Sequence, residues 1–133
     1  SAAGQRLGVS VCYEDAFGEE VIRSLPQATL PVNVSEDAWF GDSLAPHQRV
    51  QMARMRAIEA GRPMLRAANT GISGVIDPLG RIVKSLPLGV DGVIDADLPH
   101  ALPPTPYAHY GSYALILFMV VSLILIGRRR MRL

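Results

Sequence analysis

Hydrophobic and polar positions along the chain predict a first half in which strands and helices alternate. Apolar runs rich in β-branched residues are typical of buried strands, and apolar residues three and four apart indicate helices. The longest predicted helix ends at a clear stop signal, because Gly61 follows its last residue and Pro63 lies just beyond. The expected elements are a strand at 6–11, a helix at 18–25, a strand at 29–34, a polar-aromatic loop at 35–44 and a helix at 45–60.

The pattern changes to short strands after residue 63. Asp77-Pro78-Leu79-Gly80 has the composition of a hairpin turn, with proline preset at its second position. Early strand–helix alternation followed by hairpins predicts an α/β fold with a mixed sheet covered by helices. The strands expected in this half lie at 64–68, 74–77, 81–84 and 92–97.

The last third of the chain has a different character. Residues 112–127 carry no charge, and a helix over 110–127 would be about 27 Å long, close to the hydrocarbon thickness of a bilayer. Four arginines follow within residues 128–133. We therefore expect a transmembrane helix at 111–127, with its basic end in the cytoplasm and the preceding residues on the opposite side. A buried core helix is the alternative, although core helices of this length normally have a polar face.

These patterns divide the chain into a domain at 1–98, a proline-rich connector at 99–110, a membrane helix at 111–127 and a basic tail at 128–133. The tail accounts for the net charge of +1, and the rest of the chain is net acidic. There is no basic patch of the kind that binds nucleic acid. The single cysteine excludes an intrachain disulfide.

That cysteine is the candidate nucleophile. The apolar run of the first strand stops at Cys12, and Glu14 and Asp15 follow at once. A strand-to-helix turn of this kind exposes a nucleophile, and a helix N-terminus favours a thiolate. The alternative is a small buried hydrophobic residue. Neither carboxylate is clearly the base, because neighbouring side chains on a strand point to opposite sides.

No activating partner for the thiol is evident from the residues. The three histidines, His47, His100 and His109, are dispersed and show neither a Cys-His pairing nor metal-ligand spacing. The expected helix at 51–59 is most simply amphipathic, with salt-bridged charges on its solvated face. Trp39 and Phe40 lie on an acidic loop, where they either anchor the loop to the core or form a wall of an apolar substrate site.

Four motifs together resemble the C-terminal part of the bacterial apolipoprotein N-acyltransferase family and, more generally, the nitrilase or carbon–nitrogen hydrolase superfamily. They are G-V-S-V-C-Y-E-D at 8–15, S-E-D-A-W-F-G at 35–41, Q-M-A-R-M-R-A-I-E-A-G-R-P at 51–63 and R-A-A-N-T-G-I-S-G-V-I-D-P-L-G at 66–80. The resemblance implies part of an α/β/β/α sandwich followed by one transmembrane helix. It places the domain on the periplasmic side of the bacterial inner membrane.

The resemblance also implies a Glu-Lys-Cys triad that needs no metal or cofactor. Cys12 would take an acyl chain from a membrane phospholipid as a thioester, and the N-terminal amine of a diacylglyceryl-apolipoprotein would then accept the chain. Tyr13 and Glu14 match family positions of importance. The backbone N–H after the nucleophile suits an oxyanion hole.

The chain departs from the family pattern in three ways. The triad's Glu and Lys belong to sequence upstream of Cys12, the only lysine, Lys84, does not match the catalytic position, and Glu36 stands where the family has Asn. We expect a fragment that is inactive alone and folds poorly because of an open sheet edge. The competing hypotheses are a membrane-tethered amidase of the nitrilase type and a non-catalytic anchored module.

Overall fold

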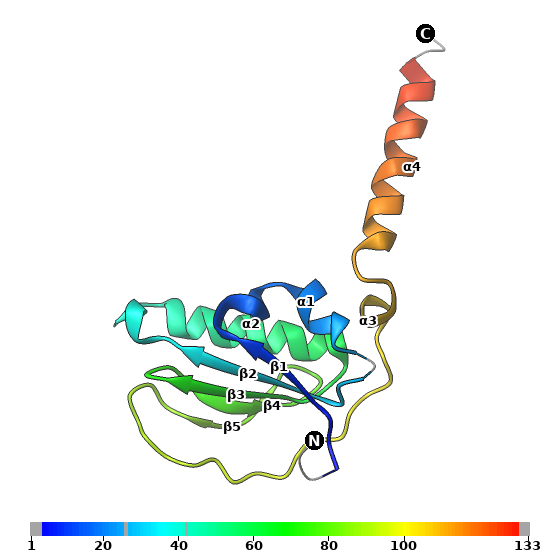
Figure 1. Cartoon of the computed structure of the whole chain (residues 1–133). Helices are drawn as coiled ribbons and strands as arrows, with labels where there is room; N and C mark the ends of the chain where they lie inside the picture. Colours follow the sequence, from blue (N-terminus) through cyan, green and yellow to red (C-terminus); the bar gives the residue numbers. More distant parts are fainter. Residues whose placement is uncertain (1–3, 26, 42, 131–133) are drawn as a thin grey trace.

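One five-stranded mixed sheet organises the protein (Figure 1). The computed structural model describes residues 4–25, 27–41 and 43–130. The strands lie side by side in chain order, with β1, β2 and β3 parallel and β3, β4 and β5 antiparallel. Their bounds are β1 Leu7–Val11, β2 Leu30–Glu36, β3 Met64–Asn69, β4 Ser73–Ile76 and β5 Ile82–Leu86.

Helices cover one face of this sheet, and α4 projects away from it (Figure 1). The bounds are η1 Cys12–Ala16, α1 Gly18–Arg23, η2 Ala38–Phe40, α2 Ala45–Ala60, α3 Pro106–Tyr110 and α4 Tyr113–Arg130, where η denotes a 3₁₀ helix. The predicted mixed sheet, its first five strands and the helix over 45–60 are confirmed. The turn at residues 77–80 is also confirmed, since the Gly80 N–H donates to the Asp77 carbonyl over 2.9 Å.

The core lies between α2 and the sheet. Ala53 and Ala57 are four residues apart on one face of α2 and are fully buried against Met64 of β3 and Ile76 of β4. Small alanine side chains let the helix approach the sheet closely, so that these two larger residues fill the space between the layers. The helix ends at Gly61, whose φ of 62° is the left-handed conformation that glycine adopts without strain.

The opposite face of the sheet is apolar and is exposed at β1 and the end of β2. The register aligns Val9 with Val32 and Val11 with Val34, so these valines share one face. Val9 is 60% exposed and Val11 is 54% exposed. Parallel strands in α/β proteins are normally covered on both faces. Strand β1 also forms one edge of the sheet, as expected.

One expectation for the segment after β5 is wrong. The strand expected at 92–97 is absent, and the described residues 91–105 contain no helix or strand. Val93 is 92% exposed, so alternation in this segment has no core to face. The connector at 99–110 contains α3, which Thr105 caps by accepting a hydrogen bond from the Ala108 N–H.

The C-terminal helix begins later than the apolar pattern predicts. Gly111 ends α3 with a φ of 52°, and α4 begins at Tyr113 and includes the first arginines of the basic tail. Residues 131–133 of the predicted tail lie outside the described residues. Over the ranges that the structure describes, no helix combines the length and apolar character needed to cross a membrane.

We predict that Met64→Ala destabilises the domain by roughly 2–5 kcal/mol, because it removes a buried side chain and leaves a cavity beneath α2. The measurement is the thermal unfolding midpoint followed by circular dichroism. Met55→Ala is the matched control, because Met55 lies on α2 and is 50% exposed. This variant should change the free energy of unfolding by less than about 0.5 kcal/mol. Equal midpoints for the two variants would contradict this packing.

Candidate active site

Cys12 lies at a sharp junction between β1 and η1. Its φ of 52° is in the left-handed region, and Thr70 is the other non-glycine residue with positive φ within the described ranges. Such a conformation costs on the order of 1–3 kcal/mol and persists only where the surroundings hold it. The predicted strand-to-helix turn is therefore present. The helix at the thiol is the short η1, however, and α1 begins six residues after Cys12.

The two residues after Cys12 are both exposed but differ in their contacts. The Glu14 carboxylate accepts a hydrogen bond of 2.7 Å from the Val11 N–H and thereby closes the turn. The Tyr13 ring is 53% exposed and packs edge-on against Phe17, with 6.3 Å between ring centroids. The Arg49 guanidinium lies over the Tyr13 ring, 5.3 Å from its centroid. Glu14 thus shapes the turn, and Tyr13 faces solvent beside it.

Two arginines and two aspartates are buried beneath this turn. We call Asp15, Asp37, Arg49 and Arg66 the charge cluster; each is at most 3% exposed. Arg66 Nη2 is 2.8 Å from Asp37 Oδ2, and Arg66 Nη1 is 3.2 Å from Asp15 Oδ2. Arg49 Nε is 3.2 Å from Asp37 Oδ1. Burial raises the pKa of Asp15, although the charges of Arg66 and Arg49 oppose the shift.

Polar side chains of β2 connect the cluster to the sheet. Asn33 Oδ1 accepts from Arg66 Nη1 over 2.6 Å. Ser35 Oγ accepts from Arg49 Nη2 over 3.0 Å and donates to Asp37 Oδ1 over 2.7 Å. The cluster therefore joins η1, β2, α2 and β3, the elements that surround the turn.

The sequence interpretation missed this cluster, although two signals for it were present. Arg49 precedes Ala53 and Ala57 by one and two steps of four residues, which places it on the buried face of α2. Arg66 lies two residues after the buried Met64, on the same face of β3. The predicted salt-bridged, solvated face of this helix is present only in part. Arg56 and Glu59 form an ion pair of 2.8 Å and are more exposed than the buried Arg49 on the same helix.

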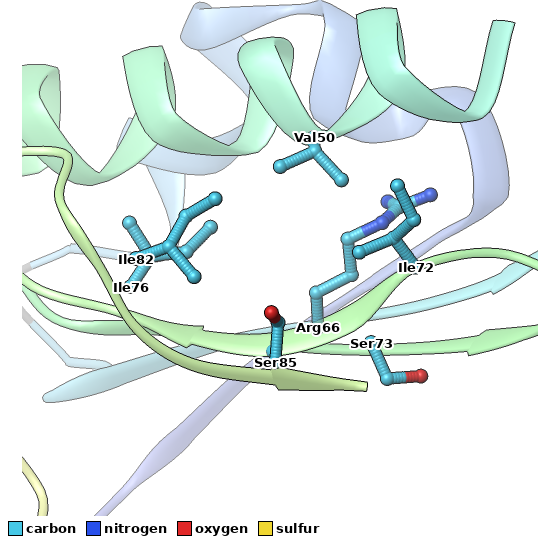
Figure 2. Close-up of a pocket in the computed structure, with 8 residues that line it drawn as sticks. Val50, Arg66, Ile72, Ser73, Ile76, Ile82 and Ser85 are labelled. Carbon is cyan, nitrogen blue, oxygen red and sulfur yellow. The ribbon is translucent and has the colours of Figure 1, made fainter. Parts of the chain in front are cut away.

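A small apolar cavity lies beside the cluster, between α2 and the last strands. Figure 2 shows Val50, Ile76 and Ile82 around it, with the Arg66 side chain rising from the sheet towards α2. Its volume is about 10 Å³, roughly the space of a single water molecule. A substrate therefore does not bind in this cavity.

The aromatic loop is exposed. Trp39 is 85% exposed and Phe40 is 38% exposed, so Trp39 does not anchor the loop to the core. The loop is instead held by Glu36, which accepts hydrogen bonds from the Ala38 N–H at 2.8 Å, Asn69 Nδ2 at 2.5 Å and Thr70 Oγ1 at 3.1 Å. These hydrogen bonds lower the pKa of Glu36, and the bond from the Ala38 N–H contributes most. The role of Trp39 and Phe40 in substrate binding stays a prediction.

The only lysine and two of the histidines lie on other elements than Cys12. Lys84 is on β5, at the opposite sheet edge from β1, and donates to the Asp95 carbonyl over 2.5 Å. His47 is the third residue of α2, and His109 is the residue before the last of α3. Within the described residues, no group of three or more His, Cys, Asp or Glu side chains is placed to hold a metal ion.

We predict that Glu36→Gln loosens the aromatic loop, because a single amide oxygen replaces the two carboxylate oxygens that accept these bonds. Hydrogen exchange at the Ala38 N–H should quicken several-fold at pH 7. Because the folded-state pKa of Glu36 is lowered, its contribution is present above the ordinary pKa of about 4.3 and is lost as pH falls through the lower, folded value.

The measurement is the Ala38 protection factor in the wild type and in Glu36→Gln between pH 7 and 3. The wild-type value should converge on that of the variant only at the acidic end. Glu20→Gln, at a salt-bridged surface site on α1, is the control and should leave the loop unchanged. A wild-type protection factor independent of pH would contradict the role of Glu36.

Comparison with known proteins places the chain among enzymes of one superfamily. It is 49% identical over 120 residues to an apolipoprotein N-acyltransferase of Bradyrhizobium diazoefficiens, covering 90% of this chain and 22% of that protein. It is 45% identical over 125 residues to the apolipoprotein N-acyltransferase of Nitrosomonas europaea, covering 94% and 25%. The chain thus spans about a quarter of the length of these curated relatives.

Solved structures share the fold. An amidase from Nesterenkonia sp. AN1 superposes with a TM-score of 0.59 at 22% identity, covering 90% of this chain and 47% of the amidase. Another structure of that amidase, 25% identical with a TM-score of 0.55 and coverage of 66% and 36%, carries the acetamide moiety of fluoroacetamide on its active-site cysteine.

The family match covers most of the domain. Residues 1–105 match the carbon–nitrogen hydrolase family, which includes the whole sheet, the turn at Cys12 and the charge cluster. The fold agreement supports the nitrilase-like part of the predicted architecture. On these matches the chain belongs to the carbon–nitrogen hydrolase family.

Proposed function

We propose that this chain carries the nucleophile of an apolipoprotein N-acyltransferase. The observation that carries the proposal is the half-buried Cys12 thiol at a strained strand-to-helix junction, in a chain whose curated relatives bear that name. A conformation that costs free energy and is braced by buried charges is typical of a functional site.

The proposed reaction has two covalent steps. The Cys12 thiolate attacks the ester carbonyl of a phospholipid, forming a carbon–sulfur bond, and the broken ester releases a lysophospholipid that takes up a proton. The N-terminal amine of a diacylglyceryl-apolipoprotein then attacks the thioester. An amide forms, the amine loses a proton, and the thiol is restored.

The base and the oxyanion cation are proposed to come from residues outside this chain. Among the described residues, the carboxylates next to Cys12 already have other partners. Glu14 accepts a hydrogen bond from the Val11 N–H, and Asp15 is buried between Arg49 and Arg66. We infer that a further layer supplies the missing Glu and Lys and covers the apolar sheet face that exposes Val9 and Val11. The chain alone would then be inactive. We call the polypeptide that carries this chain together with that layer the full-length protein.

We also propose that α4 lies in the bacterial inner membrane. Large apolar side chains are exposed all round the helix, as the four successive residues Leu117, Phe118, Met119 and Val120 show. A helix that is apolar on every side is normally buried in protein or lipid. Its apolar part, 113–127, would extend about 22 Å, and a stretch shorter than the bilayer core is accommodated by local thinning and by flanking arginines that reach the interface.

This placement suits the proposed substrates. The arginines at the C-terminal end of α4 would lie on the cytoplasmic side, and the domain would lie on the periplasmic side. Both the phospholipid and the lipoprotein acceptor are held in the same bilayer, so an anchored domain raises their effective concentration at Cys12.

A nitrilase-type amidase is the second candidate, because the Nesterenkonia amidase shares the fold and its structure carries a covalent adduct on its active-site cysteine. Such an enzyme would also form an acyl-enzyme at Cys12, but water would accept the acyl group. The two candidates therefore differ in their acyl donor and in their acceptor.

We predict that the full-length protein incubated with phospholipid gains one acyl-sized, hydroxylamine-labile adduct on Cys12. Intact-mass spectrometry detects the adduct, and Cys12→Ser should abolish it and lower transfer by roughly a thousandfold or more. Met55→Ser introduces the same residue at an exposed position of α2 and should retain both adduct and activity.

The outcomes separate the hypotheses. Absence of the adduct in the wild type would contradict the acyltransferase. Rapid turnover of a small amide with no phospholipid adduct would favour the amidase. A native thiol that alkylating agents do not modify would favour the non-catalytic module.

We predict that a fusion of residues 87–133 to a soluble reporter stays with membranes through alkaline carbonate extraction. Val120→Lys should release much of it, because a lysine at the centre of a membrane helix costs roughly 2.5–3.5 kcal/mol. Val93→Lys, at a 92% exposed position before α3, is the control and should be retained. Equal retention of both variants would contradict insertion of α4.

A further inference from the structure

The backbone carbonyl of Cys12 is held by two buried side chains. Arg49 Nη2 of α2 donates to this oxygen over 2.5 Å, and Asn33 Nδ2 of β2 donates to it over 3.3 Å. Arg49 is 2% exposed and Asn33 is fully buried. A main-chain oxygen at the strained residue is therefore fixed from two directions by groups that solvent does not reach.

Holding this carbonyl also sets the direction of the next N–H. The peptide bond between Cys12 and Tyr13 is planar, and in the trans form its C=O and N–H point in opposite directions. Because the carbonyl points into the charge cluster, the Tyr13 N–H points away from it. A rotation of this peptide plane about the axis between its two Cα atoms would move the Tyr13 N–H and leave the Cα of Cys12 in place.

The Arg49 guanidinium is itself immobilised. Its Nε lies 3.2 Å from Asp37 Oδ1, its Nη2 donates to Ser35 Oγ over 3.0 Å, and its face covers the Tyr13 ring. Arginine presents several donors in one rigid plane, whereas lysine presents a single flexible ammonium. Arg49 thus contacts both sides of the Tyr13 N–H: the Cys12 carbonyl of the same peptide and the side-chain ring of Tyr13.

We propose that Arg49 is a positioning residue that, with Asn33, locks the Cys12–Tyr13 peptide so that the Tyr13 N–H faces the carbonyl oxygen of the bound ester. The inference rests on the proposed acyl transfer at Cys12. As the thiolate forms its bond to the ester carbon, the carbonyl oxygen gains negative charge, and a correctly aimed N–H stabilises that charge. Arg49 acts through the backbone and does not touch the substrate.

The test compares two reactions of the same thiol in the full-length protein. Thioester formation from phospholipid develops an oxyanion, whereas alkylation by iodoacetamide displaces iodide and develops none. Arg49→Lys keeps the charge of the cluster but loses the planar fork. We expect the single-turnover rate of thioester formation to fall by about 10–100-fold, while alkylation changes less than about threefold. The expected fall is smaller than the roughly 100–1,000-fold cost of removing an oxyanion donor, because the Tyr13 N–H is misaimed but still present.

A second variant and a control keep the result interpretable. Asn33→Ser removes the other donor to the Cys12 carbonyl. It should lower the rate of thioester formation relative to the rate of alkylation, by a smaller factor than Arg49→Lys does. Arg54→Lys is the matched control, because Arg54 lies on α2 but donates to the Gly80 carbonyl, away from Cys12. It should leave both rates unchanged.

The outcomes distinguish this inference from the function beneath it. If the wild type forms no thioester, the proposed function fails. If the wild type forms it and Arg49→Lys slows acylation and alkylation equally, or slows neither, the positioning role is overturned. The positioning role is also overturned if Arg49→Lys mainly weakens phospholipid binding. In that case the half-saturating phospholipid concentration rises by at least as large a factor as the saturating acylation rate falls.

Discussion

Arrangement of the site depends on the buried pairing of Arg49 and Arg66 with Asp15 and Asp37. Removing four charged groups from water costs several kcal/mol per group, and the cost is offset only where charges are balanced and hydrogen-bonded. The cluster balances two charges of each sign and has polar partners from β2, so it meets this condition in part. Within the described part of the chain, Asp15 Oδ1, Arg49 Nε, Arg49 Nη1 and Arg66 Nε are buried without a hydrogen-bond partner. Breaking one member would leave an opposite charge buried and unpaired. Such a cluster therefore favours one arrangement of η1, β2, α2 and β3.

The strain at Cys12 follows from this constraint. A positive φ at a residue other than glycine is unfavourable by itself, and a free chain would relax it. Here Glu14 closes the turn from the solvent side, and Arg49 and Asn33 hold the carbonyl from below. The same cluster that makes the interior costly to disturb thus also holds the thiol on the surface of the turn. The rigidity of the turn at the half-buried Cys12 thus originates in the charge cluster.

The start of the apolar helix is tied to the same layer of helices. The Glu19 carboxylate of α1 accepts from the Ser112 N–H over 2.9 Å, and hydrogen bonds from Ser112 lower the pKa of Glu19. Thr105, the cap of α3, donates to the Glu59 carbonyl of α2, and Arg62 Nη1 donates to the Leu102 carbonyl over 2.7 Å. The segment before α4 is therefore fastened to α1 and α2. On the proposed membrane placement, these bonds set the position of Cys12 relative to the bilayer.

How far the sequence predicts this structure depends on the range of the interactions involved. Local signals were sufficient for α2, which ends at Gly61, and for the turn closed by Gly80. The strand expected at 92–97 failed because a strand needs a partner or a core, and neither shows in a local pattern. The buried role of Arg66 depends on neighbours 29 and 51 residues away in the chain, Asp37 and Asp15. The spacing from Met64 is a signal for the buried face that the sequence interpretation did not use, and only the fold shows that the charge of Arg66 is balanced there.

The charge cluster also determines how the chemistry must be divided. Asp15 follows the nucleophile closely enough in sequence to be considered as its base, yet it is fully buried and paired with two arginines. A carboxylate in that position stabilises the turn and does not exchange protons with a substrate above it. Glu14 is likewise committed to the Val11 N–H. The residues next to Cys12 therefore position the nucleophile and the Tyr13 N–H. On the proposed function, the general base and the oxyanion cation must come from the layer that covers the exposed valines of β1.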